Sequence, residues 1–100
     1  GIRVLEGVGR HPNTPHSVLE KLAKHNLAEV RRGVATNPNC PKQLLKQLAN
    51  DRSRRVLERV ATNRNTPEQV LLKLAQHSDE RVRRRALRNL KRRGVSCPST

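Results

Sequence analysis

The sequence contains no phenylalanine, tryptophan, tyrosine or methionine, so its core has to be built from smaller side chains. Leucine, valine and alanine are the apolar residues present in number, and apolar residues make up only 33% of the chain. No apolar run approaches the ~18 residues that a membrane-spanning helix needs. The aromatic side chains on which single-strand binders stack bases are also missing. These absences favour a small soluble-type fold and argue against base stacking.

Acidic residues and cysteines are scarce as well. The sequence has eight Asp and Glu residues against 22 Lys and Arg residues, so its formal net charge is +14. Such a charge favours a polyanionic partner. Cys40 and Cys97 lie far apart, a spacing that matches neither a disulfide framework nor a metal site, and a cytoplasmic location is expected. The sequence offers no glycine-rich phosphate loop, no Ser/His/Asp set and no paired carboxylates. We therefore expect a protein that is not an enzyme and that carries no metal or cofactor.

What the sequence does contain is an internal repeat of 26 residues. Leu19, Leu45 and Leu71 share one column of this repeat, and the other leucine, valine, alanine and proline columns keep the same step. The predicted organisation is a partial repeat at 1–7, full repeats at 8–33, 34–59 and 60–85, a degenerate basic repeat at 86–93 and a flexible tail at 94–100. Its first residues lack the apolar stretch of a signal peptide.

Each repeat is expected to hold two helical pieces. The first runs from about Pro15 to Lys24, with the leucine columns on its buried face. In the three repeats this helix is predicted to begin after an N-cap residue, which is Thr14, Cys40 or Thr66. A proline follows each of them at the first helical position. A shorter second piece carries the valine column. Because neither piece can bury its apolar face alone, stacked repeats should form one continuous core, as in a solenoid.

The segment Val34-Ala-Thr-Asn-Pro-Asn-Cys-Pro41, followed by Leu44-Leu45, Leu48-Ala49, Asp51 and Val56, resembles the leucine-rich repeat variant family. The resemblance covers residues 8 to about 89. It implies an all-α fold of alternating α- and 3₁₀-type helices wound into a right-handed superhelical solenoid. Gly9, Arg64 and Leu57 depart from the repeat pattern, and some members carry a cysteine-rich iron–sulfur module that nothing here resembles. The family does not dictate a function.

Arginine concentrates in the second helical pieces, and in a solenoid such positions stack into rows. Arginine is also the side chain suited to bidentate phosphate contacts. The candidate nucleic-acid-binding residues are Arg31, Arg32, Arg54, Arg55, Arg59, Arg81, Arg84, Arg85, Arg88, Lys91 and Arg92. The densest part, residues 81–93, reads as an amphipathic helix with Val82, Ala86, Leu87 and Leu90 on its buried side.

Several interpretations of this charge stay open. The favoured one is contact with a nucleic-acid phosphate backbone. The others are a membrane-surface helix, which lacks an aromatic anchor, and a solvated face whose arginines pair with acids such as Glu58 and Glu80. A scaffold that binds an acidic protein on its concave face, or a fragment of a longer repeat protein, are the alternative functions. Self-association through open repeat ends is a further expectation.

Two polar columns are expected to be structural. His25, Asp51 and His77 follow the first helix, where we predict a cap or turn contact rather than catalysis. Asn37, Asn63 and Asn89 precede the turn, where asparagine side chains commonly satisfy backbone groups. Cys40 is predicted to be a half-buried cap residue, and Cys97 falls in the predicted tail.

Overall fold

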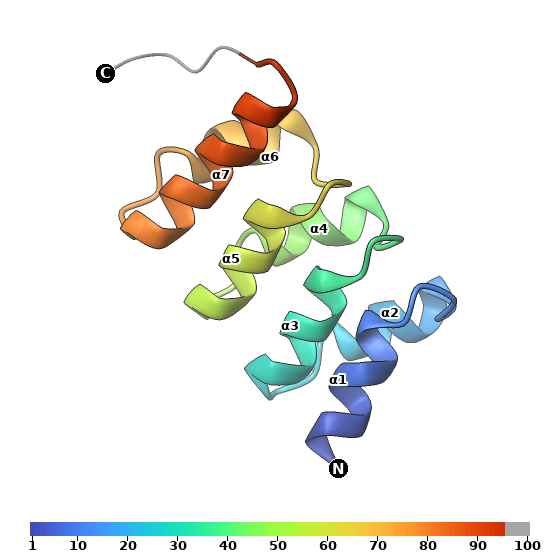
Figure 1. Ribbon diagram of the computed structural model, residues 1–100. Helices are drawn as coiled ribbons and strands as arrows, with labels where there is room; N and C mark the ends of the chain where they lie inside the picture. The colour runs from blue at the N-terminus through green and yellow to red at the C-terminus, as the bar shows by residue number, and fades with distance from the viewer. Residues whose placement is uncertain (96–100) are drawn as a thin grey trace.

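The computed structural model describes residues 1–95, which form seven helices and no strand. The helices are α1 (Ile2–Arg10), α2 (His16–Leu22), α3 (Ala28–Thr36), α4 (Lys42–Leu48), α5 (Arg54–Thr62), α6 (Glu68–Leu74) and α7 (Glu80–Arg92). They form two layers, with α1, α3, α5 and α7 side by side and the shorter α2, α4 and α6 behind them (Figure 1). This confirms an all-α protein built from sequential helical repeats.

The helices of both layers are α-helices, so the expected alternation of α- and 3₁₀-type pieces is wrong for residues 1–95. Geometry of the 3₁₀ type is confined to helix ends. The N–H groups of Lys24 and His25 donate to carbonyls three residues back, which tightens the last turn after α2. The same bonds close the turns after α4 and α6. Each short helix thus has only seven residues between its proline and this tightened turn.

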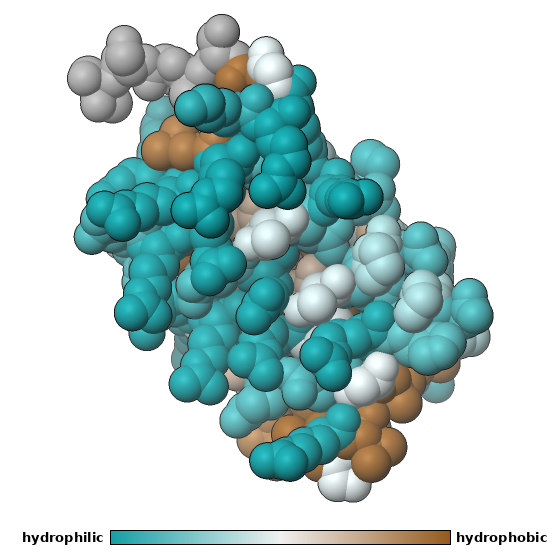
Figure 2. Space-filling model, in the orientation of Figure 1, coloured by the Kyte–Doolittle hydropathy of each residue, from teal (hydrophilic) through white to brown (hydrophobic). Residues whose placement is uncertain are grey.

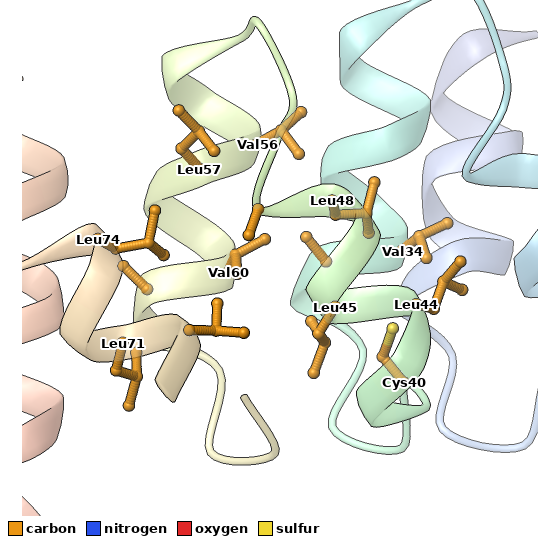
Figure 3. Close-up of a cluster of buried hydrophobic side chains, with 14 of the residues drawn as sticks. Val34, Cys40, Leu44, Leu45, Leu48, Val56, Leu57, Val60, Leu71 and Leu74 are labelled. Atoms are coloured by element: carbon orange, nitrogen blue, oxygen red, sulfur yellow. The ribbon is translucent and has the colours of Figure 1, made fainter. Parts of the chain in front are cut away.

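The leucine and valine columns form the core, as predicted. Leu19, Leu45 and Leu71 are fully buried, and Leu48 and Leu74 are nearly so. Figure 3 shows the leucines of α4 in one cluster with Val56 and Val60 of α5. The core therefore runs continuously between the two helix layers.

Leu87 is a correction to the predicted buried stripe of α7. Its side chain is 36% exposed, whereas Ala35 and Ala61, which occupy the same column, are fully buried. In α3 and α5 this column is covered by the next long helix of the stack. Within residues 1–95 no such helix follows α7, so Leu87 faces outward while Val82, Ala86 and Leu90 stay buried.

The turns before the short helices differ from the predicted capping. The prolines themselves are the N-caps, and Thr14, Cys40 and Thr66 make no side-chain capping bond. The threonine hydroxyls point backward instead: Thr66 Oγ1 donates to the carbonyl of Val60 at 2.6 Å, and Thr14 does the same to Val8. A hydroxyl hydrogen used in this way fastens the turn to the end of the preceding long helix.

Cys40 occupies the same position in the middle repeat but is fully buried rather than half-buried. Burial raises the pKa of its thiol to about 12, so the thiolate, which is the reactive form, is not populated near neutral pH. A thiol is also a weaker hydrogen-bond donor than a hydroxyl. The middle repeat therefore lacks the strong turn bond that the flanking repeats have.

Replacing Cys40 by threonine is expected to raise the free energy of unfolding by about 1 kcal/mol, the net contribution of one hydrogen bond. The new hydroxyl should donate to the carbonyl of Val34, as Thr66 donates to Val60. Urea unfolding checks this, with Cys40→Ser as a second variant that restores the hydroxyl without the methyl group. A loss of stability in both variants would show that the turn cannot use a hydroxyl at this position.

The backbones of α1 and α3 approach each other very closely. A Cβ atom on Gly33 would lie 2.5 Å from the carbonyl oxygen of Glu6, and one on Gly9 would lie 3.0 Å from the backbone nitrogen of Val34. Only glycine leaves room for backbones at this distance. This close approach explains why glycine stands at position 9, where the other repeats have alanine.

The asparagine column ties consecutive repeats together. Asn63 Nδ2 donates to the carbonyls of Ala35 and Asn37, at 2.7 and 2.8 Å, and its Oδ1 accepts from the N–H of Asn65. Asn37 and Asn89 make the equivalent bonds to the carbonyls one repeat before them. All three side chains are buried. The prediction that they satisfy backbone groups is confirmed, and the groups belong to the neighbouring repeat.

The His/Asp/His column is structural as well. His25 Nδ1 accepts from the N–H of Leu27, His77 Nδ1 from that of Asp79, and Asp51 Oδ1 from that of Ser53. Each side chain thus closes the turn that leads into the next long helix. This confirms the predicted turn contact.

Candidate nucleic-acid interface

The eleven candidate basic residues fall into two groups, because five of them are held in ion pairs. Arg31 is the most enclosed of the five, with 18% of its side chain exposed. Its Nε and Nη2 bind both carboxylate oxygens of Asp51, at 2.8 and 3.2 Å, and its Nη1 donates to the carbonyl of His25. Arg31 therefore joins the first helix pair to the second, and each of its three nitrogens already donates to a partner within the protein.

Four further candidates are paired and are more exposed than Arg31. Arg32 binds Glu6, and Arg85 Nε binds Glu58 at 2.9 Å, in both cases across a repeat boundary. Arg54 lies 3.8 Å from Asp79, and Arg84 pairs with Glu80 one turn back on the same helix. The Arg84 pair is largely exposed, so its contribution to stability is small. Glu58 and Glu80 are the two acids that the sequence had singled out as local partners.

The remaining six candidates have no ion-pair partner and no side-chain hydrogen bond within residues 1–95. They are Arg55, Arg59, Arg81, Arg88, Lys91 and Arg92. Arg59 is half-buried and the other five are exposed. All of them lie on α5 or α7, which are neighbours in the front layer (Figure 1).

Five of the six gather with Arg85 on one surface. We call this surface the arginine face, and it consists of Arg55, Arg59, Arg81, Arg85, Arg88 and Arg92. A hollow of about 160 Å³ between the helices is lined by Arg32, Glu58 and three residues of the face. Figure 2 shows hydrophilic side chains covering this part of the molecule. Lys91 lies on the same helix but lines none of these hollows, so we leave it out of the face.

Glu58 is the acid that lies within the arginine face. It lines the hollow between α5 and α7 and the adjoining hollow formed by Arg81, Arg84 and Arg88. Its side chain is 13% exposed and holds Arg85 through Nε alone. The two Nη groups of Arg85 have no partner within residues 1–95 and stay available to an outside anion.

Both ends of α7 are fixed, which holds the face in place. Asp79 caps the N-terminus, because its carboxylate accepts from the N–H groups of Arg81 and Val82. Burial opposes ionisation, but these two bonds and nearby Arg54 lower the pKa of Asp79. At the other end Arg93 donates to Asn89 and to the carbonyl of Arg64. Sequence reasoning missed this role of Arg93 because its contact with the carbonyl of Arg64 lies 29 residues away in the sequence.

One protein family matches part of the chain. The family model described as leucine rich repeat variant matches residues 28–53. That stretch covers α3, α4 and the turn that leads to α5. Residues 28–53 are therefore similar to a leucine-rich repeat variant repeat. No curated protein and no solved structure matches the chain.

The matched segment 28–53 has the length of the predicted 26-residue repeat, but it starts at the beginning of α3. The predicted repeat 34–59 starts near the end of α3 instead. In the phase of the match, each unit is one long helix followed by one short helix. Residues 2–10, predicted as a stub of a partial repeat and the start of the next, form the long helix α1. In the phase of this match the arginine face lies on long helices, α5 and α7. In its columns α3 carries no arginine, whereas α1 carries Arg3 and Arg10.

Across residues 1–95 no three His, Cys, Asp or Glu side chains are grouped to hold a metal ion, and no helix there is long and apolar enough to cross a membrane. Ile2, Val4 and Val8 expose apolar surface on α1, visible as the brown area at that end in Figure 2. Self-association through this end stays a prediction. Cys97 and residues 96–100 of the predicted tail lie outside the described part.

Proposed function

We propose that this chain is a binding module for nucleic acid that contacts the phosphate backbone through the arginine face. The observation that carries the proposal is the set of unpaired arginines on α5 and α7. Five of the eight acids already bind an arginine, yet five arginines of the face have no partner within residues 1–95. A face of this kind attracts a polyanion.

The chemistry of the face favours phosphate over other anions. The guanidinium group presents a fork of donors that matches phosphate oxygens, and it stays charged at all physiological pH values. No aromatic side chain is present to stack on bases. Backbone contacts of this type position a protein on nucleic acid without reading its sequence. We therefore propose binding without sequence preference, on a right-handed superhelix of the kind that the family resemblance implies.

A solvated surface is the alternative explanation for these arginines. It requires local acids to balance the charge, and on the arginine face that role falls to Glu58 alone. The ion pairs of Arg31 and Arg32 show what balanced arginines look like in this fold, with exposures of 18% and 29%. Clustered like charge without such pairs works against folding of a small domain. An anionic ligand would relieve this repulsion.

The chain offers a matched pair of variants for the test. Arg81 and Arg88 occupy the same two repeat columns on α7 as Arg3 and Arg10 on α1, and all four are exposed. Arg81→Gln with Arg88→Gln should weaken binding to random duplex DNA at least tenfold at low salt. Arg3→Gln with Arg10→Gln removes the same charge from the same columns and should weaken binding far less. Fluorescence anisotropy measures both.

Equal losses in the two double variants would mean that net charge, and not the arginine face, governs binding. Undiminished binding in both would reject the site outright. An acidic polypeptide serves as the second ligand. Tight binding of that polypeptide together with negligible affinity for duplex DNA would replace the proposal with the protein-scaffold function.

A further inference from the structure

We propose that the ligand of the arginine face is a nucleic-acid duplex whose axis lies along α7, rather than a chain that crosses the repeats. This inference rests on the proposed function and adds the form and direction of the ligand. It departs from the usual expectation for a solenoid, in which a ligand contacts equivalent positions of successive repeats.

A continuous row of arginines runs along α7. Arg81, Arg85, Arg88 and Arg92 are spaced by four, three and four residues, which places them on one side of the helix. With a rise of 1.5 Å per residue the row is about 16 Å long. The hollows that these residues line follow one another along the same side of α7. We call these four residues the α7 row.

In the other long helices, most of the positions equivalent to Arg85 and Arg88 are uncharged. The column of Arg85 holds Arg59 on α5 but Gly33 and Gly7 on α3 and α1. The column of Arg88 holds two threonines, Thr62 and Thr36, before an arginine returns on α1. A polyanion crossing the long helices would therefore meet arginines on α7 and α5 and little charge beyond them.

An acid also interrupts the third column. Glu29 on α3 stands where Arg55 and Arg81 stand on α5 and α7, and its side chain is exposed. Arg32, the arginine of α3 nearest the hollow, is bound by Glu6. The path across the repeats thus ends at α3, whereas the path along α7 carries an arginine in every turn.

The straight row fits a stiff ligand better than a flexible one. Duplex DNA carries one negative charge per ~1.7 Å of its axis, both strands counted, so a row of about 16 Å runs beside a stretch of duplex that carries roughly ten phosphates. Its persistence length of about 150 base pairs keeps this stretch straight. A single strand would have to be straightened on the surface, and stacking on aromatic side chains, which normally repays that ordering, is not available.

Two further double variants test the direction. Arg81→Gln with Arg92→Gln removes the ends of the α7 row, and Arg55→Gln with Arg59→Gln removes the arginines of α5. Each lowers the net charge by the same amount. The readout is the slope of log K against log salt concentration, measured with one short random duplex and with its single strand. The duplex slope should become shallower by about 1.8 for the end pair, from two lost phosphate contacts, and stay unchanged for the α5 pair.

The outcomes separate this inference from the function on which it rests. A shallower slope for the α5 pair and an unchanged slope for the end pair would overturn the direction while leaving phosphate binding intact. Single strands that bind as tightly as the duplex at every salt concentration would overturn the choice of a duplex. Slopes unchanged in both pairs would remove the arginine face as the site and with it the proposed function.

Discussion

Replacing Asn63 by alanine is expected to lower the free energy of unfolding by about 3–5 kcal/mol. The amide makes three hydrogen bonds, to the carbonyls of Ala35 and Asn37 and from the N–H of Asn65. Its loss leaves the carbonyl of Ala35 and the N–H of Asn65 without these partners, in a region where Asn63 itself is 8% exposed, and leaves the carbonyl of Asn37 with the N–H of Cys40 alone. Each unsatisfied buried group costs about 1–3 kcal/mol. The penalty falls at the middle of the array, where the asparagine joins two repeats.

Urea unfolding followed by circular dichroism measures this effect. Asn26→Ala is the matched control, because Asn26 is exposed and makes no side-chain hydrogen bond within residues 1–95. The control should keep its unfolding midpoint within error. If Asn63→Ala and Asn26→Ala unfold at the same urea concentration, the asparagine column is not what holds consecutive repeats together.

Replacing Leu48 by alanine should cost about 2–5 kcal/mol, the range found for buried leucines. Leu48 is 3% exposed and packs in the central cluster between α4 and α5 (Figure 3). The surrounding side chains belong to three helices, so they cannot collapse into the space without moving the stack. A domain of this size has a total stability of order 5–15 kcal/mol, so the variant should be largely unfolded on warming.

Leu87→Ala provides the comparison for Leu48→Ala. The two substitutions remove the same atoms, but Leu87 is 36% exposed. Its melting temperature should therefore fall by much less than that of Leu48→Ala. Similar losses in the two variants would mean that Leu48 contributes no more than a surface leucine and that the core is placed wrongly.

The periodic part of this fold could be predicted from the sequence because burial follows spacing. A column of leucines every 26 residues must face the same way in each repeat, and Leu19, Leu45 and Leu71 do. The exposure of the last described helix, α7, could not be predicted in this way. Leu87 follows the column of Ala35 and Ala61, but burial also requires a covering helix, and that is a property of the neighbour rather than of the residue.

The candidate site was harder to predict because charge alone does not show which arginines are already bound. Arg85 meets Glu58, 27 residues earlier, and Arg31 meets Asp51, 20 residues later. These separations follow from how the repeats stack, not from local spacing. One signal was present: Glu6, Arg32, Glu58 and Arg84 alternate in sign along a single column. In this column Arg32 pairs with Glu6 of the preceding repeat, whereas Glu58 binds Arg85 of the next column and Arg84 pairs with Glu80 on its own helix. The alternation therefore indicates the pairing of Arg32 but not that of Arg85.

The salt dependence of duplex binding by the unaltered chain tests the central claim most directly. Four contacts from the α7 row predict a slope of log K against log salt of about −3.6, and all six residues of the arginine face predict about −5.4. A measured slope between these values supports phosphate contacts by the arginine face. A chain that does not bind random duplex DNA at low salt, or that binds it with a slope near zero, would contradict the account.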